Sequence, residues 1–199
     1  MSGDKERDKA RLVLEKAPEV FRRYGFARTT MGDIASAAGI SRPALYLLFP
    51  NKKEVYGAVV KSTSERSLQA IQEGLRDEWS LEKKLLYTLE LSIGHAYDRV
   101  TANPGAEDLL SFNFESHKIE PSFANLQGHL AELLKEAVNN SSLAVTPHDV
   151  ARTLLSSMRG FKMAATDGRD LRRLIAVQVS LTVAALEQSK VKPRHRQRA

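Results

Sequence analysis

The sequence predicts an all-α protein with about nine helices. Apolar residues recur at steps of three and four along nearly the whole chain, and this period is typical of amphipathic helices. Apolar–polar alternation bounded by turn residues, which would indicate strands, is absent from the sequence. Proline, glycine and helix-capping residues divide the pattern into separate helices.

The composition is that of a globular protein. Of the 199 residues, 42% are apolar and 27% are charged, and no apolar run approaches the roughly 20 residues of a membrane span. The charged N-terminus lacks the apolar core of a secretory signal, so we expect a cytoplasmic protein without membrane partners. The absence of cysteine excludes disulfides and thiolate chemistry.

Three helices are expected in residues 1–50, before a larger domain over residues 51–189. The first runs from about Asp4 to Tyr24 and is stopped by Gly25. At Pro18 we expect this helix to bend or to begin anew. Thr30 is placed to cap a second helix over residues 31–38, which Gly39 ends. Ser41 then caps a third helix of about two turns, which Pro50 closes.

Six more helices follow from the same signals. Asn51 caps a long helix over residues 52–74, and another covers residues 81–101. The remaining four are expected at about residues 106–116, 121–139, 147–166 and 170–188. Residues 190–199 form a basic tail that we expect to be disordered.

The run TMGDIASAAGISRPALYLLF has the pattern of a helix-turn-helix. Two short helices meet at a glycine turn, and the second helix of such a motif enters the DNA major groove. Residues 1–53 also hold 11 Lys and Arg against 6 Asp and Glu, within a net charge of +6 for the chain. A basic N-terminal region is consistent with a polyanionic partner, although an ordinary helical hairpin with a solvated charged surface would also produce these features.

The longer run VFRRYGFARTTMGDIASAAGISRPALYLLFPNKKEVY resembles the DNA-binding domain of the TetR family of transcriptional regulators. The resemblance implies a homodimer whose third helices read half-sites of a palindromic operator one helical turn apart, about 34 Å. It also implies that the later helices bind a small-molecule effector and form the dimer. The effector would lower the affinity for DNA, so that the protein acts as a repressor.

Several residues are candidates for contacts to DNA. Arg42 is expected to grip a guanine edge, and Pro43 or Ala44 to touch a thymine methyl. The family pattern places Tyr46 on phosphate or sugar. Leu47 and Leu48 depart from that pattern, which commonly has aromatic or histidine side chains there. We expect one of the two to face the core and the other to offer only apolar contact. The full set is Arg28, Thr29, Thr30, Ser41, Arg42, Pro43, Ala44, Tyr46, Leu47, Lys52 and Lys53.

The last two helices are predicted to form the dimer surface. Small residues at steps of four let a second helix approach closely, and the final helix is apolar around much of its circumference. A helix buried within one protomer is the alternative. The predicted interface residues are Leu154, Ser156, Met158, Gly160, Phe161, Ala164, Leu174, Gln178, Leu181 and Ala185.

Aromatic residues mixed with polar ones are candidates for a pocket that takes a small apolar or aromatic effector. They are Trp79, Tyr87, His95, Tyr97, Phe112, Phe114, His117 and Phe123, although each would also suit an ordinary core. The scattered histidines show no catalytic or metal-ligand spacing, so we expect no catalytic residues, no metal and no cofactor. A DNA-binding adaptor or architectural protein without an effector is the alternative, and a helical enzyme is a more distant one.

Overall fold

The computed structural model describes residues 2–103, 108–109 and 120–190. Within these ranges the regular secondary structure is helical, apart from an isolated bridge between Ser141 and Lys190. The chain divides into two compact units: residues 1–73 with 91–124, and residues 74–90 with 125–199. The predicted division by function after residue 50 stays a prediction.

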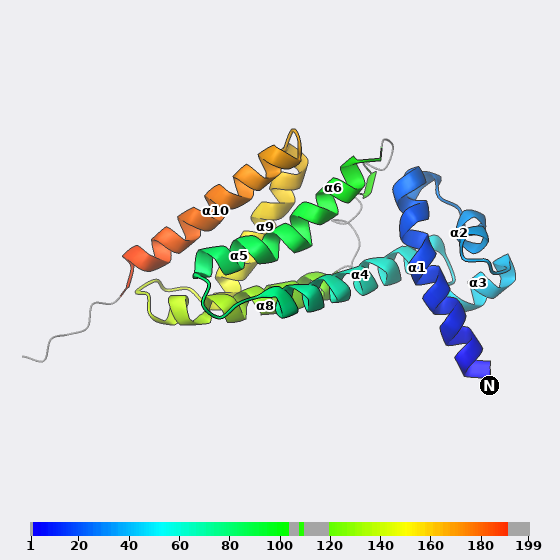
Figure 1. Ribbon diagram of the computed structural model, residues 1–199, viewed down its shortest axis with the longest axis horizontal. Helices are drawn as coiled ribbons and strands as arrows, with labels where there is room; N and C mark the ends of the chain where they lie inside the picture. The colour runs from blue at the N-terminus through cyan, green and yellow to red at the C-terminus, as the bar shows by residue number, and fades with distance from the viewer. Residues whose placement is uncertain (1, 104–107, 110–119, 191–199) are drawn as a thin grey trace, which may run out of the picture. The chain divides into compact units, whose positions relative to one another are not determined.

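The first unit begins with three helices that pack together: α1 (Ser2–Arg28), α2 (Met31–Ala37) and α3 (Arg42–Leu48) (Figure 1). At Gly25 the backbone adopts φ 75° and ψ 170°, a break between two helical segments. The predicted stop at Gly25 is therefore a kink, after which a further turn carries the helix to Arg28. The unit also contains α4 (Lys52–Gly74) except for its last residue, and α6 (His95–Thr101).

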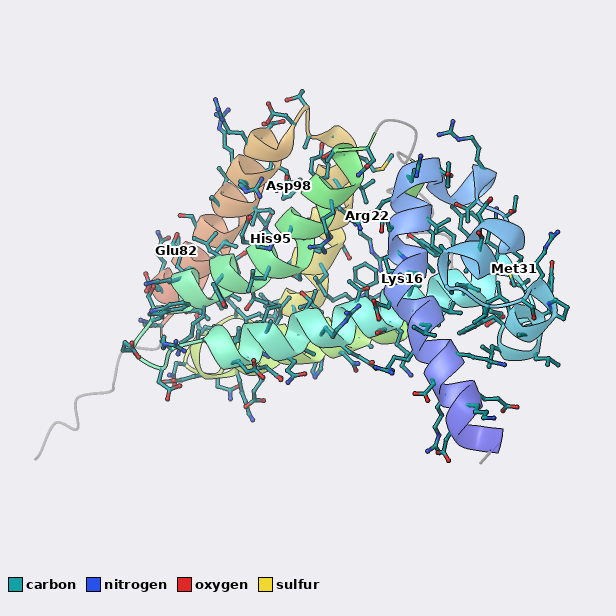
Figure 2. The ribbon with its side chains drawn as sticks, turned by 45° about the vertical axis from the view of Figure 1, so that its right-hand side comes forward. Lys16, Arg22, Met31, Glu82, His95 and Asp98 are labelled. Carbon is teal, nitrogen blue, oxygen red and sulfur yellow. The ribbon has the colours of Figure 1, made fainter. Side chains whose placement is uncertain are left out.

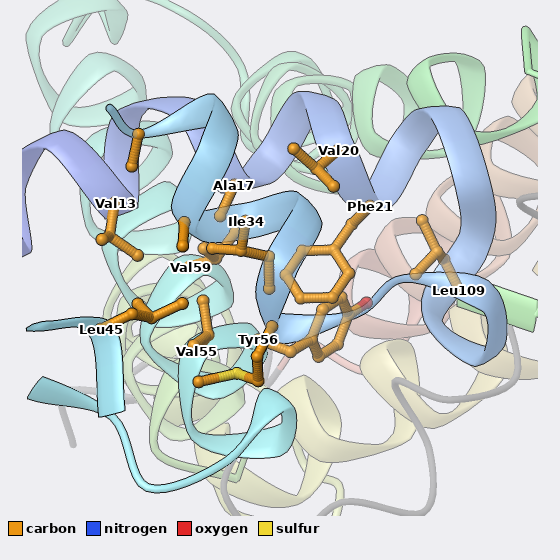
Figure 3. Close-up of a cluster of buried hydrophobic side chains, with 13 residues drawn as sticks. Val13, Ala17, Val20, Phe21, Ile34, Leu45, Val55, Tyr56, Val59 and Leu109 are labelled. Carbon is orange, nitrogen blue, oxygen red and sulfur yellow. The ribbon is translucent and has the colours of Figure 1, made fainter. Parts of the chain in front are cut away.

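Buried side chains from α1 to α4 form one core in this unit (Figure 3). Phe21, Ile34 and Leu45 are fully buried, and Val55 and Tyr56 of α4 close the cluster from the other side. The Tyr56 ring packs edge-on against the rings of Phe21 and Phe26, with distances between ring centres of 5.0 Å and 5.4 Å. Burial of side chains from all four helices holds together segments too short to be stable alone.

The second unit contains α5 (Leu81–Leu89), most of α8 (Glu120–Asn139), α9 (Pro147–Ala164) and α10 (Gly168–Gln188). Thr146 and Asp149 form a capping box at the start of α9, and Asp167 caps α10. α10 packs on both α5 and α9, and an ion pair of 2.7 Å joins Arg172 to Glu90.

The helix expected over residues 81–101 is interrupted by a π-helical turn, η1 (Glu90–Gly94), between α5 and α6. With α5, η1 and α6 counted as one helix, the described residues contain eight helices, close to the expected number. The helix expected at residues 106–116 lies mainly outside the described residues, as do residues 191–199 of the basic tail.

Candidate nucleic-acid interface

Local hydrogen bonds fix the geometry of the α2–α3 hairpin. The Thr30 hydroxyl accepts from the Asp33 amide, and the Asp33 carboxylate accepts from the Thr30 amide at 2.8 Å. The Thr30 hydroxyl also donates to the Asp33 carboxylate at 2.7 Å. This hydrogen bond and then the one from the Thr30 amide lower the pKa of the Asp33 carboxyl. Gly39 turns the chain at φ 66°, a left-handed conformation that favours glycine. The Ser41 hydroxyl then accepts from the Ala44 amide and caps α3, as the sequence predicted.

The two faces of α3 differ sharply in burial. Leu45 is fully buried, whereas Tyr46 is 49% exposed and Leu47 is 87% exposed. Ser41, Arg42 and Pro43 are also exposed, and Ala44 is half-buried. The helix is therefore anchored on one side and presents arginine, proline, tyrosine and leucine side chains on the other.

The Arg42 side chain lies over the first turn of α2. A methyl group added at Gly32 would stand 3.4 Å from both Cζ and Nε of Arg42, so the glycine leaves room for the guanidinium. The positive charge of Arg42 also contributes to the lowered pKa of Asp33. Because Arg42 is exposed, its guanidinium can leave this position for a ligand.

Lys52 holds the segment that follows the Gly25 kink. Its ammonium donates to the carbonyl oxygens of Phe26 at 2.6 Å, Ala27 at 3.0 Å and Thr29 at 2.7 Å, and it lies 4.6 Å from the centre of the Phe26 ring. An ammonium has three donors, so all three are used inside the protein. Burial lowers the pKa of Lys52, and the nearby Asp108 carboxylate opposes this effect.

Asp108 binds the same segment through its amides. One carboxylate oxygen accepts from the Phe26 amide at 3.1 Å and the other from the Ala27 amide at 2.7 Å. The kink at Gly25 leaves the amides that follow it without helical partners, and the end of α1 at Arg28 does the same for the last carbonyls. Two side chains of opposite charge satisfy these groups. Sequence reasoning missed Asp108, because its partners lie 81 and 82 residues away along the chain.

Thr29 also belongs to the interior of this junction. It is 2% exposed, and its hydroxyl donates to the Gly25 carbonyl at 2.6 Å. Since the side chains of both Thr29 and Lys52 are used by the fold, we leave them out of the proposed contacts to phosphate. Arg28 and Lys53 remain exposed.

The hairpin and its anchoring helices coincide with a known protein family. Residues 13–59 match the family model described as "Bacterial regulatory proteins, tetR family". Over these residues the chain is similar to regulators of the tetR family. The match spans α2 and α3 entirely, together with most of α1 and the start of α4, so the exposed face of α3 is the face of a tetR-type helix-turn-helix.

Relatives and solved structures agree with this assignment. The chain is 36% identical over 85 residues to the uncharacterized HTH-type transcriptional regulator YezE of Bacillus subtilis, covering 43% of each chain. The match thus spans less than half the length of that relative. The nucleoid occlusion factor SlmA of Vibrio cholerae is 24% identical over 170 residues, or 80% of this chain and 85% of SlmA.

Among solved structures, the fatty acid degradation regulator FadR of Bacillus halodurans superposes with a TM-score of 0.67. The superposition covers 89% of this chain and 96% of FadR at 17% identity. At this identity the likeness establishes the fold, which extends well beyond the helix-turn-helix. Within the described residues, no helix is long and apolar enough to cross a membrane.

The predicted dimer residues fall into two groups. Leu154 and Met158 are buried in the protomer's own core, so we leave them out of the proposed interface. Ser156, Gly160 and Ala164 are exposed along α9, and a methyl group added at Gly160 would meet no atom within 4 Å. On α10, Leu181 and Ala185 are exposed, whereas Leu174 and Gln178 are half-buried, as is Phe161 of α9.

The candidate effector residues that the structure describes belong to both units. Trp79 and Tyr87 meet edge-on at 5.3 Å in the second unit, and Lys83 lies 4.2 Å from the centre of the Trp79 ring. In the first unit, His95 is exposed on α6 (Figure 2), Tyr97 is buried and Phe123 packs against the core. Phe112, Phe114 and His117 lie outside the described residues.

His129 is a polar residue of the second unit that sequence reasoning did not select. Its Nε2 atom is buried and meets no hydrogen-bond partner among the described residues. Burial lowers the pKa of His129, which favours the neutral imidazole. A buried ring nitrogen of this kind can accept or donate one hydrogen bond to a ligand.

Proposed function

We propose that the chain is a transcriptional regulator that binds a palindromic operator as a homodimer, and that it acts in the cytoplasm as a repressor. The observation that carries the proposal is the exposed face of α3, which stands outside a fully buried anchor at Leu45. This face lies within the segment that matches the tetR family. A helix held in this way can enter the major groove without rearranging the core.

Specific roles follow from exposure and chemistry. Arg42 binds a guanine edge through two hydrogen bonds, which are worth about 1–3 kcal/mol of discrimination against other bases. The Tyr46 hydroxyl contacts the DNA backbone, together with Ser41 and the exposed charges of Arg28 and Lys53. The hydroxyl and the amide of Thr30 are both bonded to Asp33 at the start of α2, so we leave Thr30 out of the proposed contacts to phosphate as well.

The homodimer forms through the outer faces of α9 and α10. Three large apolar side chains support this proposal, because Met163, Val177 and Leu181 are 62%, 51% and 63% exposed in the single chain. The small residues Ser156, Gly160 and Ala164 allow a partner helix to approach. Two copies related by a two-fold axis would cover both the large apolar side chains and the small residues.

The effector is a small apolar or aromatic molecule bound by the later helices. Support comes from the aromatic pair Trp79–Tyr87 and from the buried Nε2 atom of His129, all in the second unit. Aromatic surface with a few polar atoms is the usual lining of such sites. Binding of the effector lowers the affinity of the dimer for its operator.

Selection of bound fragments from a random DNA pool tests the proposal. We expect a palindrome with half-sites about one helical turn apart to be enriched. Arg42→Ala should then relax the base preference within each half-site, whereas Arg66→Ala, at an exposed position on α4, should leave it unchanged. Enrichment of no palindrome would refute operator binding by α3.

The oligomeric state is tested by Leu181→Lys, with Leu143→Lys as the matched control at another exposed leucine. Sedimentation should give a dimer for the parent and the control and a monomer for Leu181→Lys, because an ammonium is costly to bury in an apolar interface. A monomeric parent at micromolar concentration would refute the dimer.

A second candidate is a DNA-binding factor without an effector. The relative SlmA of Vibrio cholerae, a nucleoid occlusion factor by name, matches 80% of this chain. A screen of small apolar and aromatic compounds against the operator complex separates the two functions. If one of these compounds releases the protein from its operator, the result supports an effector. If a palindrome is enriched but no compound releases the protein from it, the result favours the second candidate.

A further inference from the structure

Two side chains without hydrogen-bonding groups lie one helical turn apart on the exposed face of α3. Residues four apart share one face of a helix, so Pro43 and Leu47 form an apolar stripe beside the polar pair Arg42 and Tyr46. Leu47 is 87% exposed, the highest value among the large hydrophobic side chains of the described residues. Pro43 is exposed as well.

An isolated exposed leucine is common on protein surfaces and by itself means little. The position of Leu47 gives it meaning, because it extends the face of α3 that carries the arginine and the tyrosine. The major groove offers such a stripe one apolar group on the base edges, the 5-methyl group of thymine. Burial of leucine against this methyl group removes apolar surface of both molecules from water.

We propose that Leu47, with Pro43 one turn before it, reads thymine methyl groups in each half-site of the operator. The proposal rests on the proposed operator binding and names the base that this part of α3 selects. It divides base recognition along the helix between hydrogen bonds from Arg42 and apolar contact from Leu47. The half-site therefore contains a thymine at a fixed position relative to the base that Arg42 contacts.

Uracil provides the test, because it lacks only the 5-methyl group of thymine. Duplexes of the enriched operator are made with one thymine in each half-site replaced by uracil, and their Kd values are measured for the parent and for Leu47→Ala. Loss of a buried methyl contact should weaken binding by the parent about fourfold for each half-site at the contacted position. At the position that Leu47 contacts, Leu47→Ala should bind the thymine and uracil duplexes with the same Kd.

The controls test whether the effect of Leu47→Ala comes from the lost contact to DNA and not from a change in folding. Leu47→Ala should leave the unfolding curve unchanged, since the residue packs on little, and Leu47→Met should keep the preference for thymine over uracil. Leu143→Ala, at an exposed leucine in the second unit, should behave as the parent.

Two results would overturn the proposal in different ways. An equal effect of uracil on the parent and on Leu47→Ala, or no effect at any position, removes Leu47 from base reading while operator binding stands. Failure of the parent to enrich any palindrome removes the proposed function itself, and the methyl contact with it.

Discussion

Replacement of Lys52 by methionine distinguishes a structural role from a role in DNA binding. Methionine keeps much of the side chain's length and loses the ammonium that donates to the Phe26, Ala27 and Thr29 carbonyls. Two of these three hydrogen bonds are part-buried and the one to Ala27 is exposed. Water can replace the exposed one at little cost, whereas the part-buried carbonyls lose acceptor pairing.

Each part-buried bond contributes about 1–1.5 kcal/mol net. We therefore expect Lys52→Met to lower the free energy of unfolding by about 2–3 kcal/mol. Chemical denaturation at one protein concentration measures the change, because dimerisation makes stability depend on concentration. Lys53→Met is the matched control, because Lys53 is the next residue and its side chain is exposed. Substitutions of exposed side chains usually change stability by less than about 0.5 kcal/mol.

DNA binding gives the opposite pattern for the two lysines. Each phosphate that a lysine neutralises adds about 0.9 to the slope of log K against log salt concentration. With a random-sequence duplex, Lys53→Met should reduce this slope by about 0.9 per protomer, and Lys52→Met should leave it unchanged. If Lys52→Met instead keeps full stability and flattens the salt dependence, the ammonium binds phosphate and the structural assignment is wrong.

Three further predictions concern stability. Gly39→Ala should cost about 1 kcal/mol, because alanine is strained at φ 66°, and Gly39→Asn should cost less; equal losses in denaturation would contradict this explanation. Asp108→Asn should cost about 1–2 kcal/mol, since one of the two amides of Phe26 and Ala27 would face an NH₂ group, and a thermal unfolding temperature equal to the parent's would exclude the carboxylate as a necessary acceptor. Burial and then the charge of Arg159 lower the pKa of Lys162 to about 8, so the folded state binds fewer protons than the unfolded state between pH 8 and the ordinary value of 10.5. The stability of the parent should therefore rise with pH in this window relative to that of Lys162→Met, and parallel pH curves would count against the shift.

The helix-turn-helix could be predicted closely because its signals are local. Thr30, Gly39 and Ser41 act on residues within five positions of themselves, through capping and a left-handed turn. The same residues would impose these conformations in many contexts. The predicted helix boundaries over this part of the chain therefore lie within one or two residues of those in the structure.

The Lys52–Asp108 junction could not be predicted in the same way. Lys52 reaches carbonyls 23 to 26 residues away, and Asp108 reaches amides more than 80 residues away. A lysine at the start of a helix is equally suited to a phosphate, so sequence alone could not show that the Lys52 ammonium bonds to carbonyls of its own chain. The π-helical turn at residues 90–94 similarly has no local sequence signal that we can identify.

The short third helix shows why the residues on its exposed face are harder to predict than its buried ones. Its stability comes from Leu45, which is fully buried, and from Ile40 and Phe49, which pack against the same core. Leu47, at 87% exposed, contributes almost nothing to that packing, so the fold does not constrain its identity. A departure from the family pattern at this position is therefore expected to change stability little, and under the proposed operator binding its consequence lies in what α3 binds. For this reason the methyl group that is present in thymine and absent in uracil is the appropriate probe of the leucine at position 47.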